Sequence, residues 1–286
     1  MDVPLKPMER PLFRSELALV AEFACTPDEP LYADSGPSNA HCVVFPSTST
    51  RILRRGRPAM LENPTAVSFF NRGEEYRREV ISSRGTYATW YTLADELLDE
   101  ILRDAHVRER CFRAQQTVVP PATIYRQRRL LGRLLRGTPT EALAVEEELV
   151  SLTRELVARA AAVPPPAPRP NEQLVHRAIR CLLVNFSAPV TLRALARHTG
   201  ASPAYLSRVF HAATGLTMSD FRQRLRLVSS LDLLPAYEGQ VTDLALELGY
   251  SSHSHFTSCF RALFDASPTR FIAELTSAAH RAAARI

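Results

Sequence analysis

At 286 residues, the chain is long enough for two domains that each bury a hydrophobic core. Its apolar content of 45% and charged content of 23% are typical of a globular protein and exclude a disordered one. No run of about 18 apolar residues occurs, which excludes a membrane-spanning helix, and the first residues lack the apolar stretch of a secretion signal. We therefore expect a cytoplasmic protein that makes no membrane contact.

The cysteines and the charge give weaker information. The five cysteines are scattered along the chain and never spaced as CxxC, which favours free thiols over a disulfide framework. The net charge of +5 and the pI of 9.1 are a mild indication of a polyanionic partner. The composition indicates no cofactor.

A proline-rich segment divides the chain. Residues 163–170, VPPPAPRP, contain five prolines in eight positions. Because proline cannot continue a helix, this segment is predicted to be a stiff, extended linker. It separates residues 1–162 from residues 171–286.

The N-terminal half of residues 1–162 has the pattern of β-structure. Short segments rich in Val, Ile and aromatic residues alternate with Gly and Pro, as in hairpins. Many short strands predict a small barrel or a sandwich, and we expect a small β-barrel. The expected strands lie within residues 17–25, 41–46, 51–56, 59–64, 66–73 and 76–82.

A helical pattern begins at Thr92. In TLADELLDEILRDA, Thr92 and Asp95 have the spacing of a capping box, and leucines and isoleucines follow on one helical stripe. Two further helices are expected near residues 121–136 and 139–162. This helical segment either covers the barrel or pairs with a second subunit, and the sequence leaves both readings open.

Residues 171–286 contain an internal repeat, in which residues 191–221 match residues 241–271. In each copy a Leu-Ala pair precedes a glycine turn, and a serine then begins a second helix. Glycine permits the left-handed backbone that ends a helix, and serine caps the start of the next. The pattern predicts two helix-turn-helix units, a motif whose second helix enters a DNA major groove. The matched pairs include Gly200 and Gly249, Ser202 and Ser252, Leu206 and Phe256, and Phe210 and Phe260.

Residues 171–275 resemble the DNA-binding domain of the AraC family of bacterial transcription regulators. The resemblance is carried by ARHTGASPAYLSRVF, by the connecting segment RLRLVSSLDLL, and by LALELGYSSHSHFTSCFRALFDASPTRF. It implies an α+β protein: an N-terminal cupin-like β-barrel with a helical segment, then an all-α domain of two helix-turn-helix units joined by a linker helix. It also implies a nucleoid-associated regulator, an activator by type, whose expected partners are double-stranded DNA, RNA polymerase and a second copy of the chain.

The outward faces of the two second helices supply the candidate DNA-binding residues. At 100° per residue these positions point away from the apolar side of each helix. The serines that begin the helices add backbone N–H groups suited to phosphate. The candidates are Ser202, Ala204, Ser207, Arg208 and His211 in the first copy, and Ser252, Ser254, Thr257, Ser258 and Arg261 in the second.

Arg208 is the strongest candidate for reading a base, because its guanidinium can pair with guanine O6 and N7. The chain departs from the family at Ser258, where many members carry a base-reading arginine. We therefore expect the first copy to carry most of the base specificity and the second to contact mainly backbone, with Arg261 on a phosphate. Two copies on one chain imply a direct, non-palindromic, two-part DNA site.

His253, His255 and Cys259 lie close enough in sequence to suggest a zinc site. On the helical wheel, however, the two histidines fall on opposite flanks of the apolar side, and Cys259 lies in or beside the core. No metal is therefore expected here. The resemblance implies a partly buried ring for His255.

The N-terminal domain resembles the cupin-like sensor barrels of the same family over residues 41–78. The resemblance implies an unidentified small-molecule effector and a helical dimerisation segment. Five aromatic residues form either the core or the wall of a ligand pocket: Phe69, Phe70, Tyr87, Trp90 and Tyr91.

An enzyme is not expected, because the N-terminal half offers only His41 and His106 and cannot assemble a three-histidine metal site. Two alternatives remain. One is a small-molecule or metal-binding cupin-like protein with a helical interaction module; apart from it, His41 with Cys25 and Cys42 is a candidate to bind a metal or sense oxidation. The other is a regulator whose barrel only dimerises and binds no effector.

Overall fold

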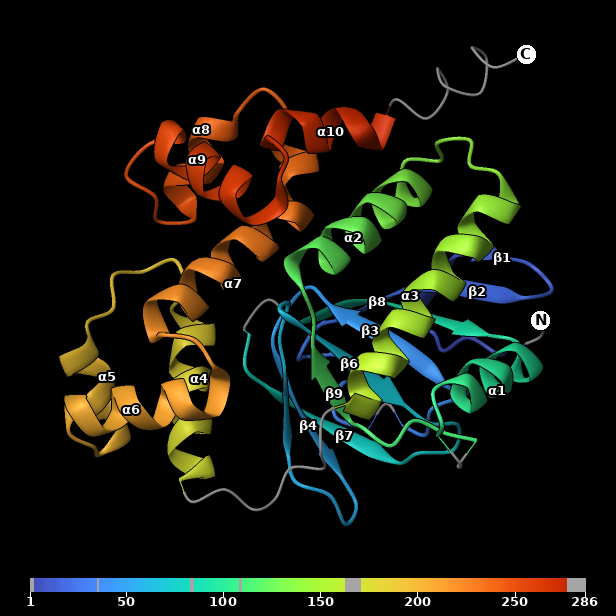
Figure 1. Ribbon diagram of the computed structural model, residues 1–286, viewed down its shortest axis with the longest axis horizontal. Helices are drawn as coiled ribbons and strands as arrows, with labels where there is room; N and C mark the ends of the chain where they lie inside the picture. The colour runs from blue at the N-terminus through green and yellow to red at the C-terminus, as the bar shows by residue number, and fades with distance from the viewer. Residues whose placement is uncertain (1–2, 35, 83–84, 108–109, 163–170, 277–286) are drawn as a thin grey trace. The chain divides into compact units, whose positions relative to one another are not determined.

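The computed structural model describes residues 3–34, 36–82, 85–107, 110–162 and 171–276 (Figure 1). The chain divides into two compact units. The N-terminal unit takes in residues 1–164 together with residues 269–286, and the helical unit takes in residues 165–268. The segment expected to be a linker, residues 163–170, lies outside the described residues.

The N-terminal unit contains two antiparallel sheets. The larger sheet has the strand order β1-β2-β8-β3-β6-β9, and the smaller has the order β5-β4-β7. All six strands expected from the sequence are present, and β1, β8 and β9 are additional. The strands are β1 (Glu9–Arg14), β2 (Ala18–Cys25), β3 (Cys42–Pro46), β4 (Thr50–Arg54), β5 (Met60–Glu62), β6 (Ala66–Phe70), β7 (Tyr76–Val80), β8 (Thr86–Leu93) and β9 (Gln116–Val118).

The expectation of a closed barrel is not met. Within the part of the chain that the structure describes, no strand ladder joins the larger sheet to the smaller one. The outer strands of the large sheet, β1 and β9, each pair on one side only, as do β5 and β7 in the small sheet. The two sheets are held instead by side chains between them, as in a sandwich.

Strand β8 lies in the middle of the large sheet and divides its side chains between two faces. Trp90 pairs with Ala21 of β2, and both belong to the apolar cluster between the sheets. Tyr91 points the other way, and its hydroxyl lies 3.0 Å from Thr153 Oγ1 in α3 (Ala142–Ala162). Because side chains alternate along a strand, β8 supplies both the cluster between the sheets and the surface that the helices cover.

Two more helices accompany α3: α1 (Asp95–Asp104) and α2 (Pro121–Leu135). The buried side of α3 includes Val145 and Leu149, as its apolar seam predicts. The capping-box prediction is wrong: α1 begins after Ala94, with no side-chain cap, and Thr92 is the penultimate residue of β8. Thr92 belongs to β8 because the backbone of Thr92 pairs with that of Leu19 in β2.

The last described helix, α10 (Pro268–Thr276), groups by its contacts with the N-terminal unit. The ring of Phe271 meets that of Tyr125 in α2 edge-on, with 5.1 Å between centroids. The Tyr125 hydroxyl donates a hydrogen bond of 3.0 Å to Glu274 Oε2. Thr138 donates a bond of 3.1 Å to the Leu275 carbonyl. Apolar and polar contacts thus attach α10 to α2 and the turn that follows it.

The helical unit contains both copies of the sequence repeat, except for α10. Its core is built from the apolar positions that recur in the two copies, and a single helix, α7, connects them. The helices are α4 (Glu172–Val184), α5 (Leu192–Thr199), α6 (Pro203–Thr214), α7 (Met218–Leu233), the short 3-10 helix η1 (Leu234–Tyr237), α8 (Val241–Glu247) and α9 (His253–Phe264).

Candidate nucleic-acid interface

The two copies end their first helices in the same way. In the first copy, Ala201 N–H donates to the Ala196 carbonyl at 3.0 Å, and in the second, Tyr250 N–H donates to the Ala245 carbonyl at 2.9 Å. Each bond spans five residues and closes the helix as a Schellman turn does. The turn glycines are left-handed: φ is 71° at Gly200 and 79° at Gly249.

The second helices, α6 and α9, also begin alike. Ser202 Oγ accepts a hydrogen bond from the Tyr205 N–H at 3.3 Å, and Ser252 Oγ accepts one from the His255 N–H at 3.2 Å. Each serine therefore satisfies one of the backbone donors that a helix start leaves unpaired. The predicted serine caps are confirmed in both copies.

The apolar side of each second helix is fully buried. Leu206 and Phe210 of α6, like Phe256 and Phe260 of α9, are 0% exposed. The ring of Phe210 packs edge-on against Phe221 of α7, with 5.7 Å between centroids. Because one side of each helix is fixed in the core, the opposite side faces solvent.

The ten candidate DNA-binding residues lie on these solvent-facing sides. Nine of the ten are exposed, and Thr257 is half-buried. The Thr257 hydroxyl lies 3.4 Å from His253 Nε2, which accounts for part of its burial. The exposed candidates are Ser202, Ala204, Ser207, Arg208, His211, Ser252, Ser254, Ser258 and Arg261.

Arg208 projects from α6 without an acidic partner among the described residues. Its guanidinium lies over the ring of Tyr205, 5.3 Å from the centroid. Tyr205 is itself 36% exposed, so this contact leaves the guanidinium at the surface. Stacking on an aromatic ring orients the side chain while leaving its N–H donors available.

Arg226 of α7 fixes the position of the second turn. Its Nε donates to the Phe186 carbonyl at 2.6 Å, one Nη donates to the Ser187 carbonyl at 2.9 Å, and the other donates to the Gly249 carbonyl at 3.0 Å. An arginine on a helix ordinarily faces solvent, but Arg226 is only 9% exposed. One buried guanidinium therefore joins α7 to the loop after α4 and to the turn between α8 and α9.

His253, His255 and Cys259 of α9 are not arranged as a metal site. His255 is exposed rather than partly buried, and its Nδ1 lies 3.3 Å from Ser251 Oγ. Cys259 is half-buried, and burial raises the pKa of its thiol. Across the described residues as a whole, no group of three His, Cys, Asp or Glu side chains is arranged to hold a metal.

A recess opens between the two sheets of the N-terminal unit, and only two of the five predicted aromatic residues line it. Phe70 and Trp90 do so. Phe69 and Tyr91 are buried but alternate to the opposite face of the large sheet, while Tyr87 is 38% exposed. The prediction missed the charged residues of the recess, because period-two alternation predicts apolar side chains on a face between sheets.

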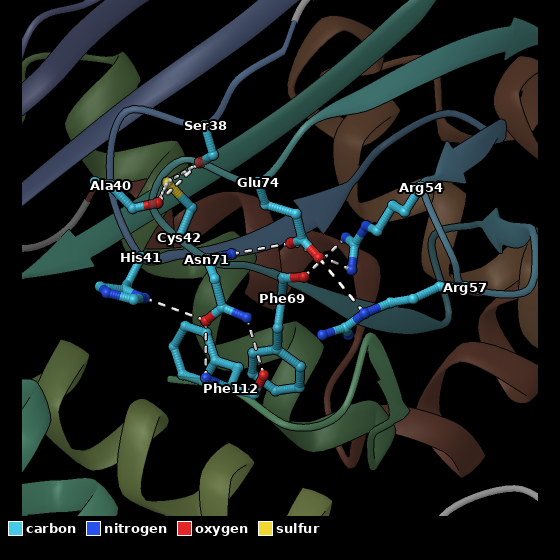
Figure 2. A network of polar contacts seen from close by, with 10 residues as sticks. All are labelled: Ser38, Ala40, His41, Cys42, Arg54, Arg57, Phe69, Asn71, Glu74 and Phe112. Atoms are coloured by element: carbon cyan, nitrogen blue, oxygen red, sulfur yellow. Dashed lines mark hydrogen bonds and ion pairs between the residues drawn. The ribbon is translucent and has the colours of Figure 1, made fainter. Parts of the chain in front are cut away.

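The loop that leads into the recess is fixed by a network of polar contacts (Figure 2). Asn71 is central: its Oδ1 accepts the Phe112 N–H at 2.8 Å, and its Nδ2 donates to the Phe112 carbonyl at 3.0 Å. Its own N–H donates to Glu74 Oε2 at 3.1 Å. Glu74 also pairs with Arg54 at 3.6 Å and Arg57 at 3.9 Å. These contacts hold the connection between β6 and β7.

His41, Cys25 and Cys42 are not arranged as a metal or redox site. His41 Nδ1 lies 3.2 Å from Asn71 Oδ1, within the same network (Figure 2). Both cysteines are buried in the cluster between the sheets. Burial raises the pKa of Cys25 to about 11 and that of Cys42 to about 12, so both thiols stay protonated at neutral pH. Protonated thiols are poor nucleophiles and poor metal ligands.

None of the described helices combines the length and the apolar character needed to cross a membrane.

The chain is similar to known regulators over its C-terminal region. A helix-turn-helix domain family model matches residues 195–274. The regulatory protein SoxS of Escherichia coli K12 is 28% identical over 101 residues, which are 35% of this chain and 94% of SoxS. The transcriptional activator RhaS of Escherichia coli SE11 is 37% identical over 84 residues, 29% of this chain and 30% of RhaS.

The chain therefore spans most of SoxS but less than a third of RhaS. Among solved structures, ToxT from Vibrio cholerae O395 aligns with 95% of this chain and 100% of its own, at 10% identity and a TM-score of 0.38. The match to the family model covers most of both helix-turn-helix units, whose turns and caps the structure repeats. In this helix-turn-helix domain the chain is therefore similar to known transcription regulators, in agreement with the resemblance to the AraC family that its sequence shows.

Proposed function

We propose that the chain binds a direct, non-palindromic, two-part DNA site through α6 and α9. The observation that carries this proposal is the repeated geometry of the two copies. Each has the same helix-ending bond, the same serine cap and the same exposed face, and α7, followed by η1, connects them. A rigid connection between two like reading helices requires two like-oriented elements in successive major grooves.

The first copy contacts a base, and the second contacts mainly the DNA backbone. Arg208, oriented by Tyr205, pairs with a guanine in the first major groove. At the equivalent position the second copy has Ser258, whose short hydroxyl gives little discrimination between bases. Arg261 binds a phosphate, and the capped starts of α6 and α9 direct backbone N–H groups to phosphates as well.

The N-terminal unit makes the regulator responsive to a small-molecule effector, and its helical segment pairs two copies of the chain. The recess between the sheets favours a unit that binds an effector over a unit that only dimerises. A ligand that binds one conformation of the full chain better than another shifts the population that can engage DNA or RNA polymerase.

Genomic DNA selection with the purified full-length protein, followed by sequencing, tests the proposal. The expected result is an asymmetric two-part motif. The selection should be repeated with residues 171–286, because SoxS consists almost entirely of the matching region and implies that this region folds alone. No motif from either protein would contradict sequence-specific binding. A motif from the shorter chain only would indicate that the N-terminal unit restrains DNA binding.

A further inference from the structure

The recess between the sheets has charged walls, although both sheets bury apolar side chains around it. The space in and in front of the recess is about 550 Å³, open solvent included. Glu62 of β5 and Arg78 of β7 line it from the small sheet, and Glu9 of β1 lines it from the large sheet. Lys6, which precedes β1, also lines it. Charged side chains in such a place are costly unless they bind each other or a ligand.

Glu62 offers an acceptor that the protein does not use. Its side chain is 3% exposed, and Oε1 has no hydrogen-bond partner among the described residues. Burial raises the pKa of this carboxyl group, and Arg78, Ser68 and Arg54 offset only part of the shift. A ligand N–H or O–H directed at Oε1 would supply the missing donor.

Trp90 offers an unused donor and an open ring. Its indole N–H is buried without a hydrogen bond, although it lies close enough to Glu9 to lower the pKa of that carboxyl group in part. No described ring or cation stacks on Trp90. The other aromatic faces nearby are occupied, since Arg78 lies 4.1 Å from the ring centroid of Phe23 and Arg54 lies 4.1 Å from that of Phe70.

The charges of the lining balance. Lys6 and Arg78 are cationic, and Glu9 and Glu62 are anionic, so two positive and two negative charges sum to zero when all are ionised. Burial acts against ionisation throughout: it lowers the pKa of Lys6 and raises those of Glu9 and Glu62. A charged ligand would leave an unbalanced charge in a site that already disfavours charge.

We propose that the recess binds a small, uncharged, flat ring compound that carries an N–H or O–H donor next to a carbonyl-type acceptor. The ring stacks on Trp90, the donor meets Glu62, and the acceptor takes the indole N–H of Trp90 or the guanidinium of Arg78. This assignment rests on the proposed effector response and names the chemical class of the effector.

Three probes of one shape test the charge assignment: benzamide is neutral, benzoate is anionic and benzamidinium is cationic. D-Glucose serves as a neutral probe that is not flat. Trp90 is the only tryptophan in the chain, so its fluorescence reports on the recess in the full-length protein. We expect a saturable change with benzamide and at least about tenfold weaker binding of the other three, which corresponds to about 1.4 kcal/mol or more.

Glu62→Gln identifies the acceptor, with Glu79→Gln as the matched control. Glu79 lies on β7 of the same sheet but is exposed and paired with Arg51 on the outer side. Glu62→Gln should weaken benzamide binding about tenfold, and Glu79→Gln should leave it unchanged. If Glu62→Gln does not fold, Trp90→Phe with a thermal-shift readout provides the second variant, and it should lose most of the stabilisation by benzamide.

Tighter binding of benzoate, benzamidinium or glucose than of benzamide would overturn the assignment, as would no saturable response to any probe. Equal weakening by Glu62→Gln and Glu79→Gln would also overturn it. These binding measurements are made without DNA, so they test the ligand class separately from the effector response. A neutral probe that binds the recess but leaves DNA affinity unchanged would therefore contradict the proposed effector response and not the ligand class.

Discussion

The second helices of the two copies, α6 and α9, differ at the position that is predicted to read a base. The first copy has Arg208, stacked on Tyr205, where the second has Ser258, and both side chains are exposed. A bidentate pair between arginine and guanine is worth about 1–3 kcal/mol of discrimination against the wrong base, whereas a serine hydroxyl contacts several bases similarly. The sequence preference of the protein should therefore depend on position 208 far more than on position 258.

Arg208→Ala should remove the preference for one guanine and weaken binding to the best site by about 1–3 kcal/mol. Ser258→Ala should change affinity by less than about 0.5 kcal/mol and leave the motif intact, because surface substitutions without a specific contact have effects of that size. Selection of randomised DNA with both variants measures the change. A motif scrambled by Ser258→Ala and kept by Arg208→Ala would reverse the assignment.

Glu62 is a buried carboxyl group whose titration should affect the stability of the fold. Burial raises its pKa above the ordinary value of 4.5, so the folded state holds the proton more tightly than the unfolded chain. The stability contributed by the protonated form is complete below about pH 4.5 and is lost as the pH rises through the pKa of the folded state.

Glu62→Gln, which cannot ionise, should therefore become more stable relative to the wild type as the pH rises from 5 to 8. Urea unfolding of both proteins across this range measures the difference, and the titration of all other groups cancels. Glu79→Gln, on the exposed side of the same sheet, should show no such trend. A constant difference between Glu62→Gln and wild type would show that Glu62 titrates normally.

At the scale of elements, the two glycine turns look equivalent in sequence but differ in their surroundings. Both glycines are left-handed, yet a Cβ at Gly200 would meet nothing within 4 Å. A Cβ at Gly249 would lie 2.2 Å from the Ser187 carbonyl oxygen and 2.6 Å from an Arg226 Nη. Those two atoms form the hydrogen bond by which Arg226 joins α7 to the loop after α4.

Gly200→Ala should cost only the penalty of a left-handed alanine, about 1–2 kcal/mol. Gly249→Ala should cost clearly more, because it adds a clash with backbone and disturbs hydrogen bonds whose loss is worth about 1–3 kcal/mol each. Chemical denaturation of the full-length variants, followed by helical circular dichroism, compares them. Equal losses would mean that the Arg226 contact adjusts without cost.

The sequence predicts those elements that depend on interactions between residues close together in the chain. The repeat, its glycine turns and its serine caps follow from short-range backbone chemistry, and the six expected strands follow from their apolar runs and turns. Strand β8 was missed for two reasons. Its first residues contain no apolar run, and its last residues were assigned to the helix that follows. Its central position arises from pairing with β2 and β3, which lie far away in sequence.

Long-range contacts explain the other errors. Arg226 looks like a surface arginine on a helix, and only the fold brings three carbonyl groups to its guanidinium. Glu62 and Arg78 lie in segments that read as ordinary strands, and nothing local reveals that both face the interior. By contrast, the outward positions of α6 and α9 were predictable, since the helical period alone assigns them once the core residues are known.

At the scale of the whole molecule, the separation between α6 and α9 depends on α7, a continuous helix of 16 residues. At 1.5 Å per residue it is about 24 Å long, and it has no glycine or interior proline at which to bend. Arg226 fixes it to the second turn, and Phe221 fixes it to Phe210 of α6. The separation between the two halves of the DNA site should therefore be fixed as well.

Insertion of about five base pairs between the half-sites should reduce binding to the non-specific level, because it turns one half-site to the opposite side of the DNA. Insertion of about ten base pairs returns the half-site to the same side but moves it about 34 Å away. A flexible connection would recover binding there, whereas the α7 connection should not. Electrophoretic mobility shifts with the selected site and both insertions, at one salt concentration, measure the effect.

Substitution of one half-site by unrelated sequence supplies the control, since both insertions should bind no better than that DNA. Recovery of affinity with the ten-base-pair insertion would contradict a rigid connection and would mean that α7 breaks or that two chains share the site.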